Sequence, residues 1–276
     1  MRSYRRGELR FDVRDSGPAD GEVVVCLHGF PQDSTAYDEV TPRLVEAGLR
    51  VLAPDQRGYS PGARPEGRSA YVLRELVADV LALLDAAGAD SAHVVGHDWG
   101  GAVAWALAGR HPDRVTSLTA LSTPHPAALQ AAALRSTQAL RSAYMAFFQL
   151  PWLPEKVALA GGGHLLESSL RGSGLPARYA RAYVQRMAEP GALRAALAWY
   201  RALPASRGYG AGRVRVPTSY LWGRADPFFA PAAAAGTRAW VTGPYVEHRL
   251  DNAGHWLPET RPGEVAAAVL RSAGRA

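Results

Sequence analysis

The chain of 276 residues contains a single cysteine, Cys26. One cysteine excludes a disulfide within the chain and any zinc site built on several cysteine ligands, and it is typical of a reducing compartment. No apolar run approaches the roughly 20 residues that a membrane helix needs. The N-terminal segment, MRSYRRGELRFDVRD, lacks the apolar stretch of a signal peptide. We therefore expect a soluble, cytoplasmic protein without a membrane partner.

The chain also lacks an extended block of one charge. Its 31 Lys and Arg against 25 Asp and Glu give a formal charge of +6 and a pI of about 9.7. Most arginines are interleaved with acidic residues; only Arg2, Arg5, Arg6 and Arg10 gather, and no aromatic stacking motif lies beside them. We interpret this cluster as a solvated basic N-terminus and expect no nucleic-acid partner.

What the first half does contain is a regular alternation of short apolar runs and amphipathic helical stretches. Buried strands are predicted over residues 22–29, 50–55, 92–98 and 115–123. Between them, residues 35–48 and 70–88 place apolar side chains three and four apart and end on glycine, as helices do. Such alternation is typical of a parallel sheet covered by helices on both faces. Residues 7–17 alternate polar and apolar instead, which predicts one or two antiparallel edge strands.

The strand pattern stops between residues 125 and 212. This segment is rich in Ala, Leu, Tyr and Arg and is broken at PWLP, GGGH, RGSGLP and EPG, which predicts several short helices. The strand pattern then returns over residues 216–223 and 245–254, and a terminal helix is predicted over residues 262–274. A helical insertion therefore interrupts one sheet.

A candidate nucleophile lies in Gly96-His97-Asp98-Trp99-Gly100, between a predicted strand and a helical run. This is the pattern of a nucleophile elbow, with Asp98 where a serine hydrolase carries serine. The flanking glycines fit a tight turn in which a Cβ atom would collide with neighbouring backbone. The other interpretation of the segment is a plain turn whose aspartate caps the helix that follows.

Two backbone amides are expected beside this aspartate. His28-Gly29-Phe30-Pro31 ends the first core strand, and the N–H groups of Phe30 and Trp99 would converge on one oxygen as an oxyanion hole. Turning the Phe30 amide toward Asp98 needs a sharp reversal, so we predict a cis peptide bond before Pro31.

Two further candidates follow the last two predicted strands. Asp226 lies in LWGRADPF and His255 lies in DNAGHW. The chain order nucleophile, acid, histidine is that of hydrolases with a nucleophile elbow. Each residue lies at the carboxyl end of a predicted parallel strand, where such sheets bind ligands. The sequence therefore predicts a catalytic group of Asp98, Asp226 and His255.

With these motifs the chain resembles the α/β-hydrolase superfamily, in the branch of epoxide hydrolases and haloalkane dehalogenases. The segments that carry the resemblance are HGFP, APDQRGYSPGARP, GHDWGG, STPHP, LWGRADPF and AGHW. The resemblance implies an α/β-hydrolase fold, with a mostly parallel sheet of eight strands flanked by helices. It also implies that Asp98 is the nucleophile, His255 the general base and Asp226 the acid that orients it. No metal and no cofactor are implied.

The family resemblance also gives the helical insertion a role as a cap over the site. We predict a core domain of residues 1–124 and 213–276 and a cap domain of residues 125–212. The expected substrate is a small hydrophobic molecule that reacts with water. A homodimer is left open by the sequence.

Epoxide hydrolases use two cap tyrosines that hydrogen-bond the epoxide oxygen. Ala198-Trp199-Tyr200-Arg201 resembles the second tyrosine motif of the family, which makes Tyr200 the expected proton donor. The spacing to Gln149 and Pro151 places Phe147 where the first tyrosine would lie, so we expect one phenol to be missing. Tyr144, one helical turn away, is the alternative second donor.

The expected reaction is the opening of an epoxide to a vicinal diol through a covalent ester of Asp98. Phe30, Trp99, Tyr144 and Phe147 are the expected substrate-binding side chains. A haloalkane dehalogenase is an alternative, although its second halide donor would fall at Phe30, which has no side-chain N–H. A cofactor-free ring-opening or cyclising enzyme and a non-catalytic binding protein of the same fold are the others.

Overall fold

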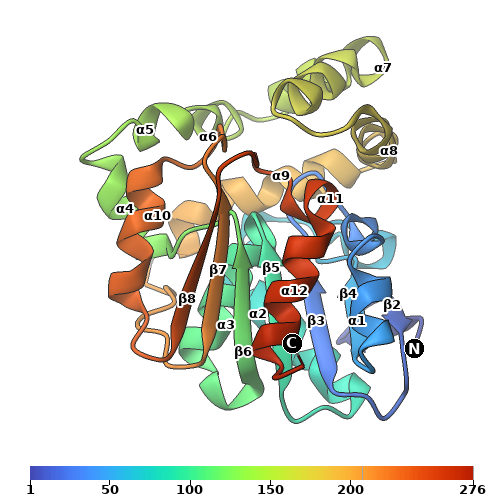
Figure 1. Cartoon of the computed structure of the whole chain (residues 1–276). Helices are drawn as coiled ribbons and strands as arrows, with labels where there is room; N and C mark the ends of the chain where they lie inside the picture. Colours follow the sequence, from blue (N-terminus) through green and yellow to red (C-terminus); the bar gives the residue numbers. More distant parts are fainter. Residues whose placement is uncertain (207, 276) are drawn as a thin grey trace.

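The computed structural model describes residues 1–206 and 208–275 and contains one mixed sheet of eight strands (Figure 1). The strands are β1 (Ser3–Arg6), β2 (Leu9–Ser16), β3 (Val23–Leu27), β4 (Arg50–Pro54), β5 (Ala92–His97), β6 (Val115–Leu121), β7 (Thr218–Gly223) and β8 (Tyr245–Leu250). Their order across the sheet is β1-β2-β4-β3-β5-β6-β7-β8. Strands β3 to β8 pair in parallel, and β1 and β2 are antiparallel. The predicted eight-stranded α/β-hydrolase architecture is confirmed.

Helices cover both faces of this sheet (Figure 1). The helices outside the predicted cap are α1 (Thr41–Glu46), α2 (Leu73–Ala87), α3 (Trp99–Arg110), α10 (Pro231–Gly236), α11 (Leu257–Thr260) and α12 (Pro262–Ser272). Helices α2 and α3 pack in one apolar cluster with the sheet, while α1 and α12 pack in a second cluster on the opposite face. Among the described residues, no helix combines the length and apolarity that crossing a bilayer requires.

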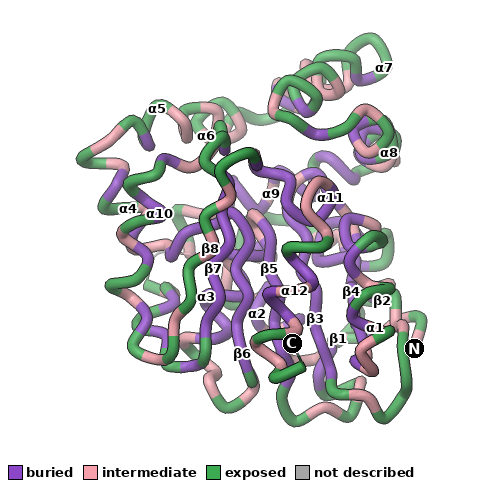
Figure 2. Tube along the Cα trace, viewed as in Figure 1, coloured by how far each residue is buried: buried purple, intermediate pink, exposed green. Residues whose placement is uncertain are grey.

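The central strands explain why the first half of the sequence shows continuous apolar runs. All residues of β3, β5 and β7 are buried, as Figure 2 shows for the middle of the sheet. A parallel strand covered on both faces has no solvent side, so its sequence does not alternate. The edge strand β8 is largely exposed by contrast.

One predicted helix is divided in two. Residues 35–48 form a short 3-10 turn over Ser34–Tyr37 and then α1, which begins at Thr41. Pro42 lies in the first turn of α1, where its missing N–H costs nothing and its fixed φ favours a new helix start. The prediction of a single helix here was therefore wrong.

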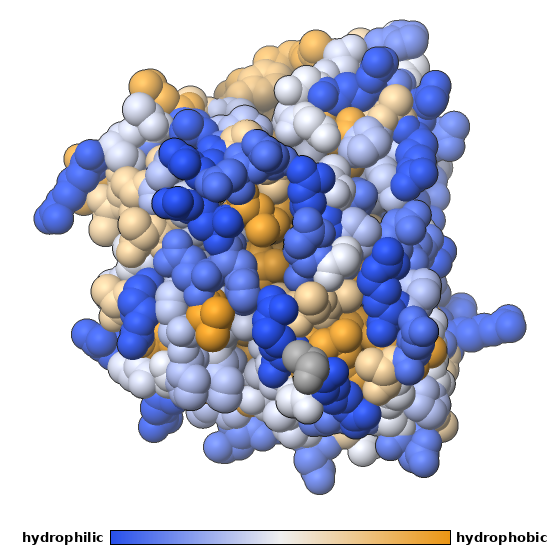
Figure 3. Space-filling model, viewed as in Figure 1, coloured by the Kyte–Doolittle hydropathy of each residue, from blue (hydrophilic) through white to orange (hydrophobic). Residues whose placement is uncertain are grey.

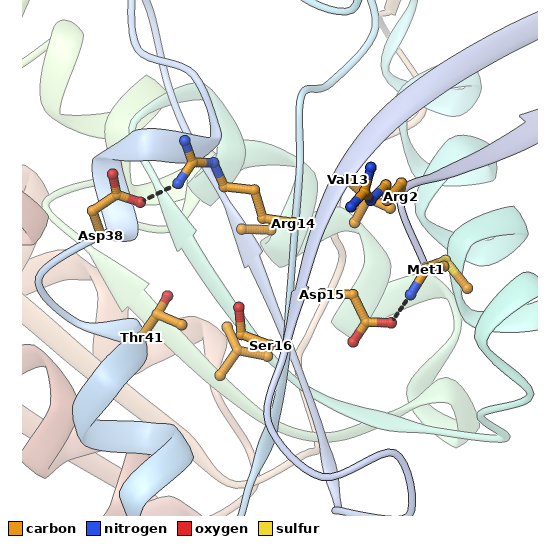
Figure 4. A pocket seen from close by; sticks show the side chains of 10 residues that line it. Met1, Arg2, Val13, Arg14, Asp15, Ser16, Asp38 and Thr41 are labelled. Carbon is orange, nitrogen blue, oxygen red and sulfur yellow. Dashed lines mark hydrogen bonds and ion pairs between the residues drawn. The ribbon is translucent and has the colours of Figure 1, made fainter.

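The basic N-terminus is only partly a solvated cluster. Arg2, Arg5 and Arg10 are exposed, but Arg6 donates to the Asp79 carboxylate at 3.0 Å and pairs with Glu75 at 2.8 Å. Figure 4 shows two further pairs on this hairpin, one joining Arg14 to Asp38 and one joining the N-terminal amine to Asp15. Several of its charges thus fasten the antiparallel hairpin to the rest of the fold.

Between β6 and β7, the described residues form helices and no strand, as the sequence predicts. These helices are α4 (Pro126–Ala133), α5 (Gln138–Arg141), α6 (Tyr144–Phe147), α7 (Leu153–Gly172), α8 (Ala177–Met187) and α9 (Ala192–Arg201). They lie above one edge of the sheet in Figure 1. That they form a separate domain, bounded at residues 125 and 212, stays a prediction.

Two features shape this helical segment. Helix α7 is interrupted at Ala160–Gly163, where three successive glycines adopt left-handed φ values of 57°, 74° and 85°. Helix α9 is fastened to the core because the Trp199 indole donates to the Arg57 carbonyl at 2.8 Å. The Arg57 side chain is itself held by two hydrogen bonds to the buried Asp79 carboxylate, of 2.7 and 2.6 Å. The helix that carries Tyr200 is therefore rigidly placed over the sheet edge.

Candidate active site

The predicted elbow is present between β5 and α3. Asp98 has φ 51° and ψ −118°, a conformation that is strained for any residue with a side chain. A Cβ atom on Gly96 would collide with the Gly100 carbonyl, and one on Gly100 would collide with the Leu27 carbonyl. The Asp98 side chain makes no capping hydrogen bond to α3. The turn therefore directs the carboxylate toward the sheet edge, and the interpretation as a helix cap is wrong.

The three predicted polar residues meet at this edge. His255 Nδ1 lies 2.9 Å from Asp226 Oδ2, and His255 Nε2 lies 3.8 Å from Asp98 Oδ2. The other oxygen of Asp226 accepts from the backbone N–H groups of Phe228 at 2.7 Å and Phe229 at 3.1 Å. Asp226 is thus fixed in place and aligns the imidazole, whose second nitrogen faces the Asp98 carboxylate.

The two oxygens of Asp98 have different surroundings. The Phe30 N–H donates to Oδ1 at 2.8 Å, and the peptide bond before Pro31 is cis, as predicted. Oδ2 faces His255 instead. Burial raises the pKa of Asp98, while the charge of His255 and the backbone N–H groups of Phe30 and Trp99 favour the ionised form. One oxygen is therefore anchored, and the other is available for chemistry.

The electrostatics of His255 favour a base with a raised proton affinity. Burial opposes its charged form, but the charge and hydrogen bond of Asp226, followed by the charge of Asp98, outweigh burial and raise the pKa of His255. Its backbone carbonyl accepts from the Ser122 hydroxyl at 2.6 Å and lies 2.9 Å from His97 Nε2. Hydrogen bonds from its neighbours therefore hold the His255 loop in place, and the nearby carboxylates favour the protonated imidazole.

A cavity of about 290 Å³ lies against Asp98, Phe30 and His255 and extends toward α7. The wall from α7 consists of Pro154, Val157, Ala158, Leu165, Leu166 and Leu170, with Ser169 and Ser173 beside them. No Lys, Arg or Glu belongs to the lining in the part of the chain that the structure describes. Phe147 and Leu165 line the cavity and are also exposed to solvent, so they lie at its opening. Hydrophobic surface also shows near the top of Figure 3, where the cap helices lie.

Two phenols line this cavity together with Asp98. Tyr200 comes from α9 and Tyr144 from α6, and their ring centroids are 6.1 Å apart. Burial, followed by the neighbouring Tyr144 and Asp98, raises the pKa of Tyr200 well above its usual range. Burial likewise raises the pKa of Tyr144. Both groups are therefore kept protonated and able to donate hydrogen bonds.

The structure places two phenols at the cavity, Tyr200 and the alternative donor Tyr144. Phe147, predicted at the place of the first family tyrosine, lines the cavity as well and is 36% exposed. Tyr144 lies in α6 and packs against Phe148, which directly follows this one-turn helix, with ring centroids 5.5 Å apart. That Phe147 replaces a donor tyrosine stays a prediction, and Tyr144 offers the second phenol.

The other two predicted binding side chains differ in their placement. Phe30 lines the cavity, and its ring packs edge-on against Tyr200 and Phe148. The Trp99 ring packs against Tyr200 and Trp199, with centroids 4.9 and 5.7 Å apart, and is not among the described lining residues. Trp99 therefore contacts Tyr200 rather than the described lining.

Several lining residues were missed by sequence reasoning. Phe228 follows Asp226 by two residues, and Trp256 directly follows His255, so their nearness to the predicted triad was the available signal. The α7 side chains carried no such signal, because the packing of a cap helix depends on contacts that no local pattern encodes.

Comparisons with known proteins agree with this geometry. Residues 22–262 match the family model described as alpha/beta hydrolase fold. The AB hydrolase superfamily protein YfhM of Bacillus subtilis is 36% identical over 95% of this chain and 93% of its own length. Epoxide hydrolase A of Mycobacterium tuberculosis is 33% identical with the same coverages. The crystal structure of Epoxide Hydrolase A from Mycobacterium thermoresistibile superposes with a TM-score of 0.83 at 28% identity, covering 98% of this chain and 97% of that one. The chain therefore belongs to the α/β-hydrolase fold family, in its epoxide hydrolase-like branch.

Proposed function

We propose that this protein is an epoxide hydrolase, which opens an epoxide to a vicinal diol through a covalent ester of Asp98. The observation that carries the proposal is the pair of protonated phenols, Tyr144 and Tyr200, that line the same apolar cavity as the Asp98 carboxylate. An epoxide needs both groups at once, a nucleophile behind the carbon and a hydrogen-bond donor on the ring oxygen.

In the first step, Asp98 Oδ2 attacks an epoxide carbon. A C–O bond forms as the ring C–O bond breaks, and the ring oxygen takes a proton from Tyr200 or Tyr144. Oδ2 is the attacking oxygen because Oδ1 is held by the Phe30 N–H. The product is a hydroxyalkyl ester whose carbonyl oxygen, Oδ1, already lies at the amide that stabilises an oxyanion.

In the second step, water replaces the alkyl group. His255 Nε2 removes a proton from water, the water oxygen attacks Asp98 Cγ, and the negative charge on Oδ1 is held by the Phe30 and Trp99 amides. The acyl C–O bond then breaks, and the leaving oxygen takes the proton from His255, which releases the diol. The proton left on the Asp98 carboxyl returns to the tyrosinate formed in the first step, which restores the Asp98 carboxylate and the phenol. Asp226 keeps Nδ1 protonated throughout, as its 2.9 Å contact supports. An aspartyl ester can be cleaved by water, whereas a serine nucleophile would give a stable ether.

A parallel assay of diol formation and halide release tests the assignment. We expect purified protein to convert terminal aryl and alkyl epoxides to diols and to release no halide from chloro- or bromoalkanes of equal size. Halide release without diol formation would identify a dehalogenase. Turnover of neither class would contradict the assignment and favour the cyclising or non-catalytic alternative.

The substrate we propose is an uncharged epoxide with an apolar substituent that extends from Asp98 toward Leu166 and Leu170. Burial of each methylene contributes about 0.8 kcal/mol, or roughly a fourfold gain in kcat/KM. A series of 1,2-epoxyalkanes should therefore show about this gain for each added carbon until the cavity is full. An omega-carboxylate on the same chain should lose it, because the lining that the structure describes contains no Lys or Arg to pair with it. Equal kcat/KM across the series would contradict this substrate class.

We also propose that the protein works in the cytoplasm. The single thiol, Cys26, is buried and unpaired, which fits a reducing compartment.

A further inference from the structure

A buried carboxylate outside the triad lies close to it in the chain. Glu259 belongs to α11, four residues after His255, and is 5% exposed. Its Oε1 accepts from Gln32 Nε2 at 2.7 Å and from the Tyr183 hydroxyl at 2.8 Å. Its Oε2 is also buried but has no hydrogen-bond partner. The mechanism derived above does not use this residue.

Hydrogen bonds connect this carboxylate to the catalytic loop. Gln32 Oε1 accepts from the Gly29 N–H at 2.7 Å, and it lies 2.8 Å from His97 Nδ1. His97 Nε2 in turn lies 2.9 Å from the backbone carbonyl of His255. Gly29, Gln32 and His97 belong to the strand ends that also carry Phe30 and Asp98. Glu259 is therefore linked to the oxyanion-hole loop and to the histidine loop by one buried network.

A buried carboxylate with hydrogen bonds to only one of its oxygens lowers the stability of the folded state. Burial raises the pKa of Glu259, while the hydrogen bonds from Gln32 and Tyr183 and the charge of His255 favour the ionised form. A buried acceptor without a hydrogen-bond partner destabilises the fold. A neutral amide of the same shape would hold the same neighbours at lower cost, so packing alone gives no reason for a carboxylate here.

The change of charge during the reaction offers a reason for a carboxylate at position 259. In the free enzyme, the carboxylates of Asp98 and Asp226 and, more weakly, Glu259 raise the pKa of His255. Formation of the ester removes the charge of Asp98 just before His255 must accept a proton from water. Asp226 and Glu259 are then the anions left to stabilise the imidazolium.

We propose that Glu259 is a positioning residue that sustains the basicity of His255 during hydrolysis of the Asp98 ester. This inference rests on the proposed function for its catalytic meaning, whereas the titration of His255 can be measured in the free enzyme without substrate. The hydrogen bond from Tyr183, which belongs to the cap helix α8, ties this carboxylate to the cap.

Several other titratable groups face His255 or Glu259. His97 and Asp226 face His255 from β5 and from the loop after β7, and Asp98 faces it from the elbow. Tyr183 faces Glu259 from α8. The buried Tyr37 lies near Glu259, and burial raises its pKa well above the usual range, so it stays neutral.

The test compares Glu259→Gln with Tyr183→Phe. Gln keeps the shape and an acceptor for Gln32 and Tyr183 but removes the charge. Phe removes one hydrogen bond and keeps the carboxylate, whose ionised form Gln32 and His255 still favour. The first readout is an NMR titration of His255 in protein with labelled histidine and no substrate. We expect Glu259→Gln to lower the pKa of His255 by about one pH unit and Tyr183→Phe to change it by less than about 0.3.

The second readout is the pH profile of ester hydrolysis in single-turnover experiments. Because neutral His255 is the base, a lower pKa moves the acid-side midpoint of Glu259→Gln to lower pH by about one unit. The weaker base should lower the plateau rate about three- to tenfold, while the rate of ester formation changes less than about twofold.

An unchanged pKa of His255 in Glu259→Gln, with thermal melting showing a folded protein, would overturn the inference. An equal shift in Tyr183→Phe would also overturn it, since packing rather than charge would then be responsible. A shifted pKa in protein that forms no ester with any epoxide would leave the Glu259–His255 coupling standing and would instead contradict the proposed function.

Discussion

Replacing His255 with Gln should stop the reaction after ester formation. The variant retains the Asp98 nucleophile and both phenols, so it can open the ring. It lacks the base that activates water, because the imidazole whose Nε2 lies 3.8 Å from Asp98 Oδ2 is gone. We expect kcat to fall by about 10²- to 10⁴-fold. Intact-protein mass spectrometry should show the enzyme plus one substrate mass, and peptide mapping should place the added mass on the segment that contains Asp98.

The control for this experiment is Asp98→Ala, which should show no adduct at any time. A His255→Gln variant that turns over at the normal rate would contradict the covalent mechanism. An adduct that maps elsewhere would contradict Asp98 as the nucleophile.

Removing the phenols should impair the first step. Tyr200→Phe and Tyr144→Phe each leave one donor in the cavity, so each should slow ester formation by about 10- to 100-fold. The double variant leaves the developing alkoxide without a donor and should lose about 10³-fold or more. Rapid mixing followed by Trp fluorescence measures ester formation directly.

Tyr179→Phe is the matched control, because Tyr179 is a cap tyrosine on α8 that does not belong to the described cavity lining. It should leave the rate of ester formation unchanged. If Tyr144→Phe behaves like this control while Tyr200→Phe alone abolishes the step, then Tyr144 is not a donor. If neither single variant nor the double variant slows the step, the ring oxygen is activated by another group.

The sheet and the elbow could be predicted because local constraints determine them. Strands buried on both faces show continuous apolar runs, and the glycines around Asp98 are required wherever that strained turn occurs. The topology then brings the loops after β5, β7 and β8 to one edge, so the motifs in those loops had to meet.

The segment between β6 and β7 could be predicted only as helical. Which side chains of α6 reach the cavity depends on how a single helical turn packs against Phe228 and Tyr200, so spacing alone could not show that Tyr144 lines it together with Phe147. The wall from α7 depends in the same way on the break at Gly161–Gly163, which directs two helical arms around one cavity. Long-range packing of this kind leaves no periodic trace in the sequence.

Glu259 was missed for a related reason. A glutamate on a short helix after the catalytic histidine gives no local sign of burial, since such a residue is usually exposed. Its oxygen Oε1 is enclosed by Gln32 and Tyr183, which lie 227 and 76 residues away in sequence, so no local pattern marks it.

A single turnover in water enriched in oxygen-18 shows whether the oxygen added to the epoxide comes from Asp98. With enzyme in excess over a terminal epoxide, we expect a diol that carries unlabelled oxygen and a peptide containing Asp98 that gains the label. Oxygen-18 in the first-turnover diol, with an unlabelled Asp98, would show direct attack by water and rule out the covalent ester.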